Sequence, residues 1–332
     1  MDKLTKNIPI YFSLFCIFSL NLSFLVIPSQ NQSIVQADFN PYSVRNIDFS
    51  IPDPARYPIK IGILDEPVLT ASGAAVLDRR SGVFLYQKNP DQSLSPASIV
   101  KIMTATVALE TYSPLEVIMV PKVSDEGQDM KLVEGELITV EALLYGLLVS
   151  SANDAAQVLA RNYSGGEAKF IEKMNDKTEE IGLKNTFFTN PTGLDNGIPG
   201  FAGSSKSSAR DLAWLADYAL KNEIFAKIVA TKKVILKDPQ NRFVHPLTNL
   251  NELLWTVPGV KGVKTGWTEI AGECLVTYFD QDQRQLITVI LGSKDRFGES
   301  KRLLDWINAD FKWEDLNPET ISKRITLGYI GQ

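Results

Sequence analysis

The sequence predicts an α/β fold with αβα layers, in which one antiparallel sheet is assembled from both ends of the chain and flanked by helices. Three observations carry this prediction. Alternating apolar residues within 73–89 predict two early strands. Apolar residues at helical spacing between 97 and 221 predict a mostly helical lobe inserted into the fold. A second group of strands, within 262–291, precedes a last helix.

The composition of the 332-residue chain is that of a globular protein, with 44% hydrophobic and 22% charged residues. Its 34 Lys and Arg residues against 39 Asp and Glu give a net charge of -5, so nucleic acid is not an expected partner. The single histidine, His245, and the two cysteines, Cys16 and Cys274, are too few for a multi-histidine or thiolate zinc site. We therefore expect chemistry by hydroxyl, amine, amide and carboxylate groups.

The first 37 residues have the layout of an export segment. Lys3 and Lys6 precede the apolar run 8–27, and no charged residue follows before Asp38. Small or branched residues near the end of the segment favour signal-peptide cleavage after Ala37. The apolar run is also long enough to remain as an N-terminal membrane anchor. In either form, the catalytic part is expected to be exported and to lie outside the cytoplasm.

The globular core is expected to begin after a proline-rich arm. Residues 38–60 contain four prolines without helical or alternating period, which predicts an extended linker over 38–64. The run 73–89 that follows predicts a hairpin turning at Ser81-Gly82. We expect the core to cover 65–312 and a short tail to cover 313–332.

Further along the chain, the middle is predicted to be mostly helical and the last third returns to strands. At one helix start, Ser208 and Asp211 have the spacing of a capping box. Helices are predicted over 140–149, 155–163, 167–181, 208–221 and 299–311, and strands over 262–266, 274–279 and 286–291.

The first chemical cluster is Ser98 and Lys101. Ser95 as N-cap and Pro96 at the first helical position predict a buried helix over 97–111, whose first turn presents both side chains on one face. A helix N-terminus disfavours a protonated lysine, and a neutral amine could accept the proton of a serine nucleophile. Taken alone, the pair is more simply a capped helix with a solvated lysine.

The second cluster is Ser151 and Asn153, directly after the Leu-rich segment 142–149. A hydroxyl and an amide two residues apart, in the loop between two buried helices, could face a shared cleft from a rigid support. Serine and asparagine are also common caps between consecutive helices. This cluster therefore identifies no function by itself.

The third cluster is Lys264-Thr265-Gly266, on a predicted strand. The lysine ammonium and the threonine hydroxyl could hold a carboxylate, and Gly266 would let a substrate lie against the backbone. An edge-strand lysine that discourages aggregation is the simpler alternative for the tripeptide alone.

The three clusters together are more specific than each alone. Ser-x-x-Lys, Ser-x-Asn and Lys-Thr-Gly occur in this order, as in penicillin-binding proteins and class A β-lactamases. The sequence resembles the serine D-alanyl-D-alanine carboxypeptidases, the low-molecular-mass penicillin-binding proteins, which implies a β-lactamase/transpeptidase-like fold. The resemblance makes 65–312 a DD-peptidase catalytic domain. It is carried by the segments 96–105, 150–156, 190–195, 207–216 and 263–276.

Two features depart from the family's pattern. Trp267 stands where the family often has histidine, which bears on pH behaviour and substrate fit. No sizeable β-rich domain is expected after residue 312. This makes the N-terminal segment 8–27 the expected membrane tether if the protein has one.

The resemblance implies a role for each catalytic residue. Ser98 attacks the carbonyl of the D-Ala-D-Ala bond in a peptidoglycan stem peptide, with Lys101 as the acylation base. Ser151 relays the proton to the leaving amine, and water then frees the enzyme. Penicillins and other β-lactams acylate the same serine. No metal or organic cofactor is required.

The same resemblance implies how the substrate is bound. Asn153 orients the substrate amide, while Lys264 and Thr265 hold the terminal carboxylate beside Gly266. The backbone N–H groups of Ser98 and Trp267 form the oxyanion hole, a device worth about 3–4 kcal/mol per donor.

Other functions stay open at this point. A DD-endopeptidase would use the same residues on cross-linked peptides. A class A-like β-lactamase needs a deacylating glutamate in a loop some tens of residues after the second cluster. No glutamate lies between Glu180 and Glu223, and Asp195, the only carboxylate in 182–197, is interpreted as a turn residue. A non-catalytic wall-binding protein would not need Ser98. A Ser-His-Asp hydrolase is disfavoured because Gly-x-Ser-x-Gly is absent, and His245 is interpreted as structural.

Overall fold

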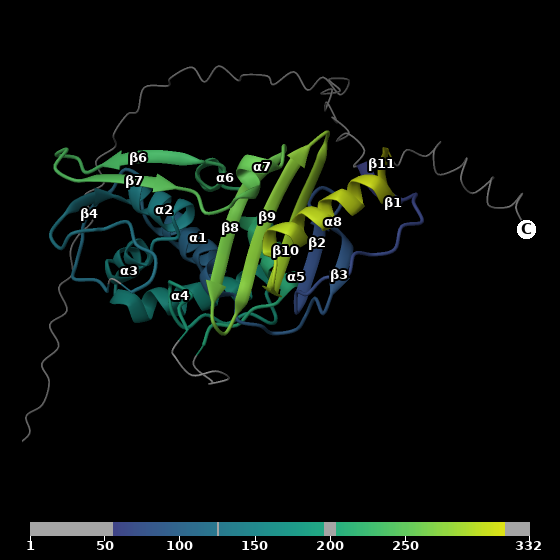
Figure 1. Ribbon diagram of the computed structural model, residues 1–332. Helices are drawn as coiled ribbons and strands as arrows, with labels where there is room; N and C mark the ends of the chain where they lie inside the picture. Colours follow the sequence, from purple (N-terminus) through teal and green to yellow (C-terminus); the bar gives the residue numbers. More distant parts are fainter. Residues whose placement is uncertain (1–55, 125, 196–203, 316–332) are drawn as a thin grey trace, which may run out of the picture. The chain divides into compact units, whose positions relative to one another are not determined.

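The computed structural model describes residues 56–124, 126–195 and 204–315 (Figure 1). Its largest sheet has five antiparallel strands in the order β3-β2-β10-β9-β8. Two strands come from the N-terminal part of the chain and three from the C-terminal part, so the predicted assembly from both ends is confirmed. The strands are β2 (Gly73–Asp78), β3 (Val83–Lys88), β8 (Val260–Thr268), β9 (Gly272–Gln281) and β10 (Arg284–Ser293).

Alternation along the strands sends apolar side chains to both faces of this sheet. In β2, Ala75 and Leu77 join the core shared with the helical lobe, while Ala74 and Val76 join a second core under helix α8. Helix α8 (Arg296–Asp310) lies across one face, and α1 and α5 lie behind the other (Figure 1). The predicted αβα layers are therefore confirmed.

The helical lobe lies between β3 and β8 along the chain, as predicted. Four of its helices fall within two residues of the predicted limits at both ends, and a fifth, the first, does so at its C-terminal end. Ser208 caps α5 as expected, because its hydroxyl accepts a hydrogen bond from the N–H of Asp211. The helices are α1 (Lys101–Thr111), α2 (Val140–Val149), α3 (Asn153–Arg161), α4 (Gly166–Ile181), α5 (Ala209–Ala219) and α6 (Glu223–Val229).

The start of the first helix differs from the prediction. Residues Ala97–Val100 form a 3-10 turn, and α1 continues from Lys101. Ser95 is not the N-cap, since no side chain caps this turn, and its hydroxyl instead donates to Asp195 Oδ1 at 3.2 Å. The tighter turn with a left-handed residue, Ala97 (φ 48°), therefore replaces a capped α-helical start.

Two hairpins, helix α6 and one further short helix were not predicted. Figure 1 shows β6 and β7 as a long hairpin along the edge of the helical lobe. The elements are β4 (Val117–Met119) with β5 (Leu137–Thr139), β6 (Lys233–Lys237) with β7 (Val244–Thr248), and α7 (Leu253–Thr256).

A separate two-stranded pair joins the two ends of the described chain. Strand β1 (Arg56–Lys60) lies within the predicted arm and pairs antiparallel with β11 (Phe311–Asp315), directly after α8. The predicted export segment lies outside the described residues. No helix among the described residues has the length and apolar character to cross a bilayer.

Candidate active site

A cavity of about 750 Å³ opens between the helical lobe and the end of strand β8. Five parts of the chain line it: the turn before α1, the loop between β4 and β5, the start of α3, the loop after α4, and the end of β8 with the turn that follows it. The lining residues are Ser98, Gly127, Gln128, Asn153, Leu194, Asp195, Trp267, Thr268, Glu269 and Ile270.

The first cluster meets the second directly beneath this cavity. Lys101 is fully buried, and its Nζ lies 3.0 Å from Oγ of Ser98 and 2.7 Å from Oδ1 of Asn153. The third neighbour of the amine, at 2.6 Å, is the carbonyl oxygen of Thr192. The alternative of a capped helix with a solvated lysine is therefore wrong.

These three contacts fix how a neutral amine would orient. The Asn153 amide oxygen is assigned by its other end, where Nδ2 donates to the Glu126 carbonyl at 2.8 Å. The oxygens of Asn153 and Thr192 can only accept, so they take two N–H groups of Lys101. The lone pair is then left for the hydroxyl of Ser98, which is the arrangement a general base requires.

Burial also prepares Lys101 electrostatically. Desolvation lowers the pKa of Lys101 to about 7, although the nearby charge of Asp154 acts to raise it. No carboxylate of the described residues forms an ion pair with this amine. A substantial fraction of the lysine is therefore uncharged at neutral pH and able to take a proton.

A short turn sets the position of the Thr192 carbonyl. Asn190 Oδ1 accepts hydrogen bonds from the N–H and hydroxyl of Thr192, at 3.1 and 2.9 Å, and from the N–H of Gly193 at 2.7 Å. This is an Asx-type turn, built by the Asn-Pro-Thr-Gly segment. The sequence analysis interpreted the segment as a turn but did not predict its contact with Lys101.

Backbone strain marks the same region. Ala97, just before the serine, has φ 48°, and Ser151, between α2 and α3, has φ 64°. Non-glycine residues in this conformation concentrate at functional sites, where the surrounding structure enforces them. Ser151 is buried in the predicted loop between two helices, and Asn153 is the first residue of α3.

The third cluster lies on β8, which is an edge strand of the sheet as predicted. A Cβ added to Gly266 would lie 3.1 Å from the backbone nitrogen of Ser98, a tight contact, so glycine at this position favours the close approach of the strand to the nucleophile. Trp267 follows with 62% of its side chain exposed and lines the cavity. Thr265 is buried and pairs with Leu275 of β9.

Lys264 is buried rather than solvated, which excludes the role of an exposed edge-strand lysine. Its Nζ donates to the Thr265 carbonyl at 2.8 Å. Burial lowers the pKa of Lys264 well below its usual value, and the charges of Lys101 and Arg296 lower it further. Lys101, Lys264 and Arg296 thus gather three basic side chains at one end of the site, and an anionic ligand there would favour their protonated forms.

Arg296 is the site residue that the sequence analysis missed. It begins α8, and its Nη1 donates to the Gly266 carbonyl at 2.8 Å. A cation at the first position of a helix opposes the macrodipole, so its placement there is a signal that could have indicated a special role.

The structure thus brings Ser98, Lys101 and Asn153 into direct contact and places Gly266 against the nucleophile. Two further carboxylates, Asp195 and Glu269, lie in the cavity wall. Of these, Asp195 had been interpreted only as a turn residue. The described residues contain no group of three His, Cys, Asp or Glu side chains that could hold a metal ion.

Comparison with known proteins identifies the family. The family model for D-alanyl-D-alanine carboxypeptidase, Peptidase_S11, matches residues 63–295. The D-alanyl-D-alanine carboxypeptidase DacF of Bacillus subtilis is 35% identical over 265 residues, which cover 76% of this chain and 66% of that protein. A D-alanyl-D-alanine endopeptidase of Pseudomonas aeruginosa is 32% identical, covering 76% of this chain and 82% of its own length.

Solved structures agree with this assignment. The crystal structure of the Streptomyces K15 DD-transpeptidase superposes with a TM-score of 0.68 at 30% identity, covering 74% of this chain and all of that one. The range matched by the family model, 63–295, spans well over half of the sequence and includes the sheet, the inserted helical lobe and the three clusters. This chain belongs to the D-alanyl-D-alanine carboxypeptidase family, Peptidase_S11.

Proposed function

We propose that this protein is a serine DD-carboxypeptidase that removes the terminal D-alanine from peptidoglycan stem pentapeptides through an acyl-enzyme. One observation carries the proposal: the buried Lys101 amine lies 3.0 Å from Ser98 Oγ, while two oxygen acceptors occupy its N–H groups. The pair therefore forms an activated nucleophile beside a cavity of suitable size for a peptide end.

Acylation begins when Ser98 transfers its proton to the neutral Lys101. The Oγ atom bonds to the carbonyl carbon of the penultimate D-alanine, and the carbonyl oxygen becomes an oxyanion. The backbone N–H groups of Ser98 and Trp267 are proposed to stabilise it, which the close passage of Gly266 at Ser98 supports. The C–N bond then breaks as the leaving amine takes a proton from Lys101, directly or through the Ser151 hydroxyl.

The free carboxylate of the substrate is proposed to bind among Lys264, Thr265 and Arg296. Cations without ion-pair partners among the described residues favour this placement, since burying a negative charge there relieves their mutual repulsion. Asn153 has both ends of its amide engaged, with Lys101 and with the Glu126 carbonyl. The Asn153 side chain is therefore already fixed in position when the substrate binds beside it.

Deacylation returns the enzyme to its resting state. A water molecule adds to the acyl carbon, gives one proton to the base, and releases the shortened peptide as the Ser98 hydroxyl re-forms. β-Lactams are proposed to acylate Ser98 by the same route, as strained amides whose ring nitrogen is the leaving group.

The test compares two substrates of the purified protein. Release of D-alanine from a stem pentapeptide, with little cleavage of a cross-linked peptide dimer, supports a carboxypeptidase. Preferential cleavage of the dimer would assign a DD-endopeptidase, the name carried by the Pseudomonas aeruginosa relative. No reaction with either substrate, together with retained binding of wall peptides, would leave only a non-catalytic role.

The site of action is proposed to be the outer face of the cytoplasmic membrane. The apolar run 8–27 behind Lys3 and Lys6 supports export, with the segment either cleaved after Ala37 or kept as a membrane tether. Protease added to intact protoplasts should digest the catalytic part. Protection of that part would contradict export.

A further inference from the structure

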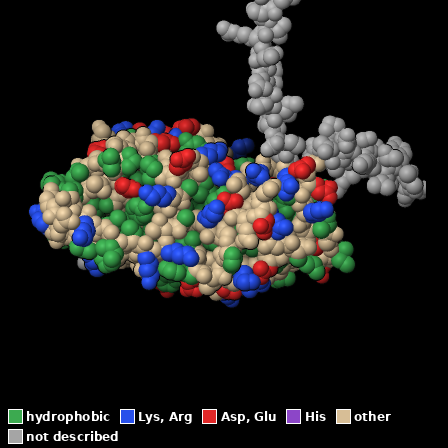
Figure 2. All heavy atoms as spheres, turned by 90° about the horizontal axis from the view of Figure 1, so that it is seen from above, with side chains coloured by type: hydrophobic (Ala, Val, Ile, Leu, Met, Phe, Trp, Pro, Cys, Tyr) green, Lys and Arg blue, Asp and Glu red, His purple; other side chains and the backbone are tan. Residues whose placement is uncertain are grey.

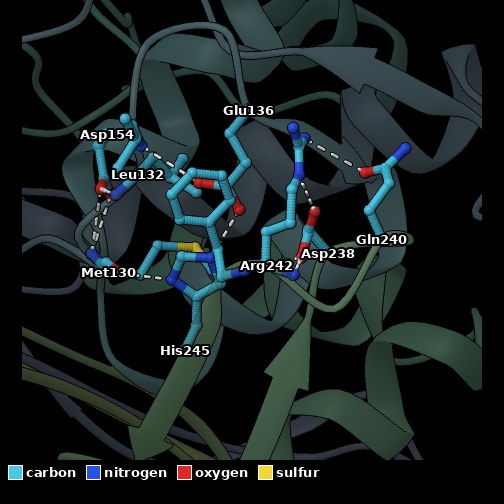
Figure 3. Close-up of polar contacts among 10 residues, drawn as sticks. Met130, Leu132, Glu136, Asp154, Asp238, Gln240, Arg242 and His245 are labelled. Carbon is cyan, nitrogen blue, oxygen red and sulfur yellow. Dashed lines mark hydrogen bonds and ion pairs between the residues drawn. The ribbon is translucent and has the colours of Figure 1, made fainter.

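The only histidine of the chain has two partners that tie distant segments together. His245 lies on β7 and is 3% exposed. Its Nδ1 is 2.8 Å from the Met130 carbonyl oxygen, and its Nε2 is 2.7 Å from Glu136 Oε1 (Figure 3). Figure 2, viewed from the side of the β6–β7 hairpin, shows no histidine at the surface. The ring is therefore an interior link and not a surface group.

The chemistry of these partners fixes one of the two contacts. A backbone carbonyl can only accept, so Nδ1 of His245 must carry a proton and donate it to Met130. In the contact between Nε2 and Glu136, the shared proton lies either on Nε2 or on the Glu136 carboxyl. In both arrangements the link to Met130 is an N–H···O bond, while Glu136 supports the ring from its other side.

The Met130 backbone is held from the opposite direction by α3. Its N–H lies 3.1 Å from both carboxylate oxygens of Asp154, and the N–H of Leu132 lies 3.1 Å from Oδ2 of the same residue (Figure 3). Residue 130 is thus clamped between β7, through its carbonyl, and the first turn of α3, through its N–H.

The segment fixed in this way forms part of the cleft. The Gln128 carbonyl accepts from the Asn153 N–H at 2.6 Å, and the Glu126 carbonyl accepts from Asn153 Nδ2. Gly127 and Gln128 line the cavity, and a Cβ on Gly127 would lie 2.6 Å from Asn153 Nδ2. A shift of this segment would therefore move the amide that holds Lys101.

We propose that His245 is a positioning residue for acylation, because its Nδ1–H···O=C bond to Met130 fixes the cleft segment 126–132 and, through it, the Asn153 amide that orients Lys101. The inference rests on the proposed function and deepens it. It assigns a role to a side chain that the catalytic clusters do not contain. It also explains why a hairpin remote from Ser98 in sequence carries a buried imidazole.

Two substitutions separate the contacts of the ring. In His245→Asn, the amide nitrogen can take the place of Nδ1 and keep the bond to Met130. In His245→Gln, the amide nitrogen reaches toward the position of Nε2 and keeps only the contact with Glu136. Both variants remove the imidazole, so they share the general cost of altering the core. The Asn variant is therefore the matched control for the Gln variant.

The first readout is the rate of acylation by a fluorescent penicillin, with kcat and KM on a pentapeptide. We expect His245→Gln to lower the acylation rate and kcat by about tenfold, a factor equal to about 1.4 kcal/mol, with KM changed little. The proposed carboxylate site is formed by residues of β8 and α8, outside this segment. His245→Asn is expected to stay within about threefold of the parent.

The second readout is hydrogen exchange of the amides in 126–132. It should accelerate in His245→Gln and not in His245→Asn, at a temperature where circular dichroism shows both variants folded. Equal rates of acylation in the two variants, or unchanged exchange in His245→Gln, would overturn the inference. If the parent were not acylated at all, the proposed function would fail, and the exchange comparison would still decide whether His245 anchors the segment.

Discussion

The carbonyl oxygen of Thr192 lies 2.6 Å from the amine of Lys101, although the two residues are 91 positions apart in the sequence. The carbonyl is positioned by the turn that Asn190 closes, and the two residues after this turn, Leu194 and Asp195, line the cavity. The orientation of the catalytic base is therefore set by a loop as much as by its own helix.

Replacing Asn190 should uncouple this loop from the base. Asn190→Ala leaves three donors of Thr192 and Gly193 without their acceptor, so we expect a loss of about 1–3 kcal/mol in the free energy of unfolding. Acylation by penicillin should also slow, because the Thr192 carbonyl no longer holds one N–H of Lys101. Asn190→Asp keeps the acceptor and should restore both. Normal acylation by the Ala variant would contradict the role of the turn.

Acylation should depend on the protonation of Lys101. Because burial lowers the pKa of Lys101 to about 7, the rate should fall about tenfold per pH unit below that value and level off above it. Stopped-flow labelling with penicillin across the pH range measures this profile. Lys101→Met should lose most of the activity and show no such limb. A rate independent of pH would remove Lys101 as the base.

The same pKa shift predicts the pH dependence of stability. The folded protein gives up the Lys101 proton near pH 7, whereas an unfolded lysine keeps it until near 10.5. The unfolded state therefore binds more protons in this interval, and the free energy of unfolding should rise with pH across it. Burial also lowers the pKa of Lys264, so this residue too makes the free energy of unfolding rise with pH. The measurement is therefore the slope of the free energy of unfolding against pH, obtained from urea titrations and compared between the parent and Lys101→Met.

A fluorescent penicillin should label one residue, Ser98. Ser98→Ala should abolish labelling because it removes the hydroxyl nucleophile that contacts Lys101. Ser113→Ala, which alters an exposed serine just beyond the other end of α1, is the matched control and should label like the parent. Cys274 is buried, and burial raises the pKa of its thiol to about 11, so it will not compete. Labelling of Ser98→Ala at the parent level would end the assignment.

Substrates with an amidated C-terminus should be cleaved poorly. The amide lacks the negative charge that Lys264 and Arg296 are placed to bind, so kcat/KM should fall at least about tenfold. In Arg296→Leu, the preference for the free acid should shrink. Arg302, on the next turns of α8 and paired with Asp295, provides the control substitution Arg302→Leu, which should retain the preference. Equal turnover of acid and amide by the parent would refute the carboxylate site.

The penicilloyl-enzyme should persist for many minutes. No glutamate follows the second cluster where a class A β-lactamase has its deacylating base. Asp195 and Glu269 are the carboxylates that line the cavity, so these two are the candidates for a deacylating base. Intact-mass spectrometry after a penicillin pulse measures the lifetime. Rapid return to the unmodified mass over several turnovers would identify a β-lactamase, and the variants Asp195→Asn and Glu269→Gln would then locate its base.

Patterns with a fixed period made most of the fold predictable. The alternation in β2 and β3 and the helical spacing in α2 and α4 follow directly from burial on one or two faces. Strand β7 was missed because Pro246 lies within it, and proline normally argues against a strand. The pairing of β6 with β7 tolerates it because the two strands form their own small sheet.

The site was predictable only where its residues form short motifs. Ser98 with Lys101, and Ser151 with Asn153, are recognisable because each pair lies within one turn. The segment 126–132, which holds Asn153 through backbone carbonyls, has no periodicity and no side-chain pattern that indicates this role. Arg296 reaches the site from the start of α8, and Thr192 reaches it from the turn that Asn190 closes. Contacts of this kind depend on tertiary structure, which no local pattern records.

The pairing of β1 with β11 has a mechanical consequence. In its antiparallel register, Arg56 lies opposite Asp315, so the two chain ends leave from the same end of the pair. A force that pulls Arg56 and Asp315 apart would open the β1–β11 pair one hydrogen bond at a time, beginning at the ion pair between these two residues. Strands loaded in this unzipping direction yield before a sheet loaded along its strands. A pull on both ends of the described chain would thus open the β1–β11 pair before it reaches the five-stranded sheet that carries Gly266 beside the nucleophile.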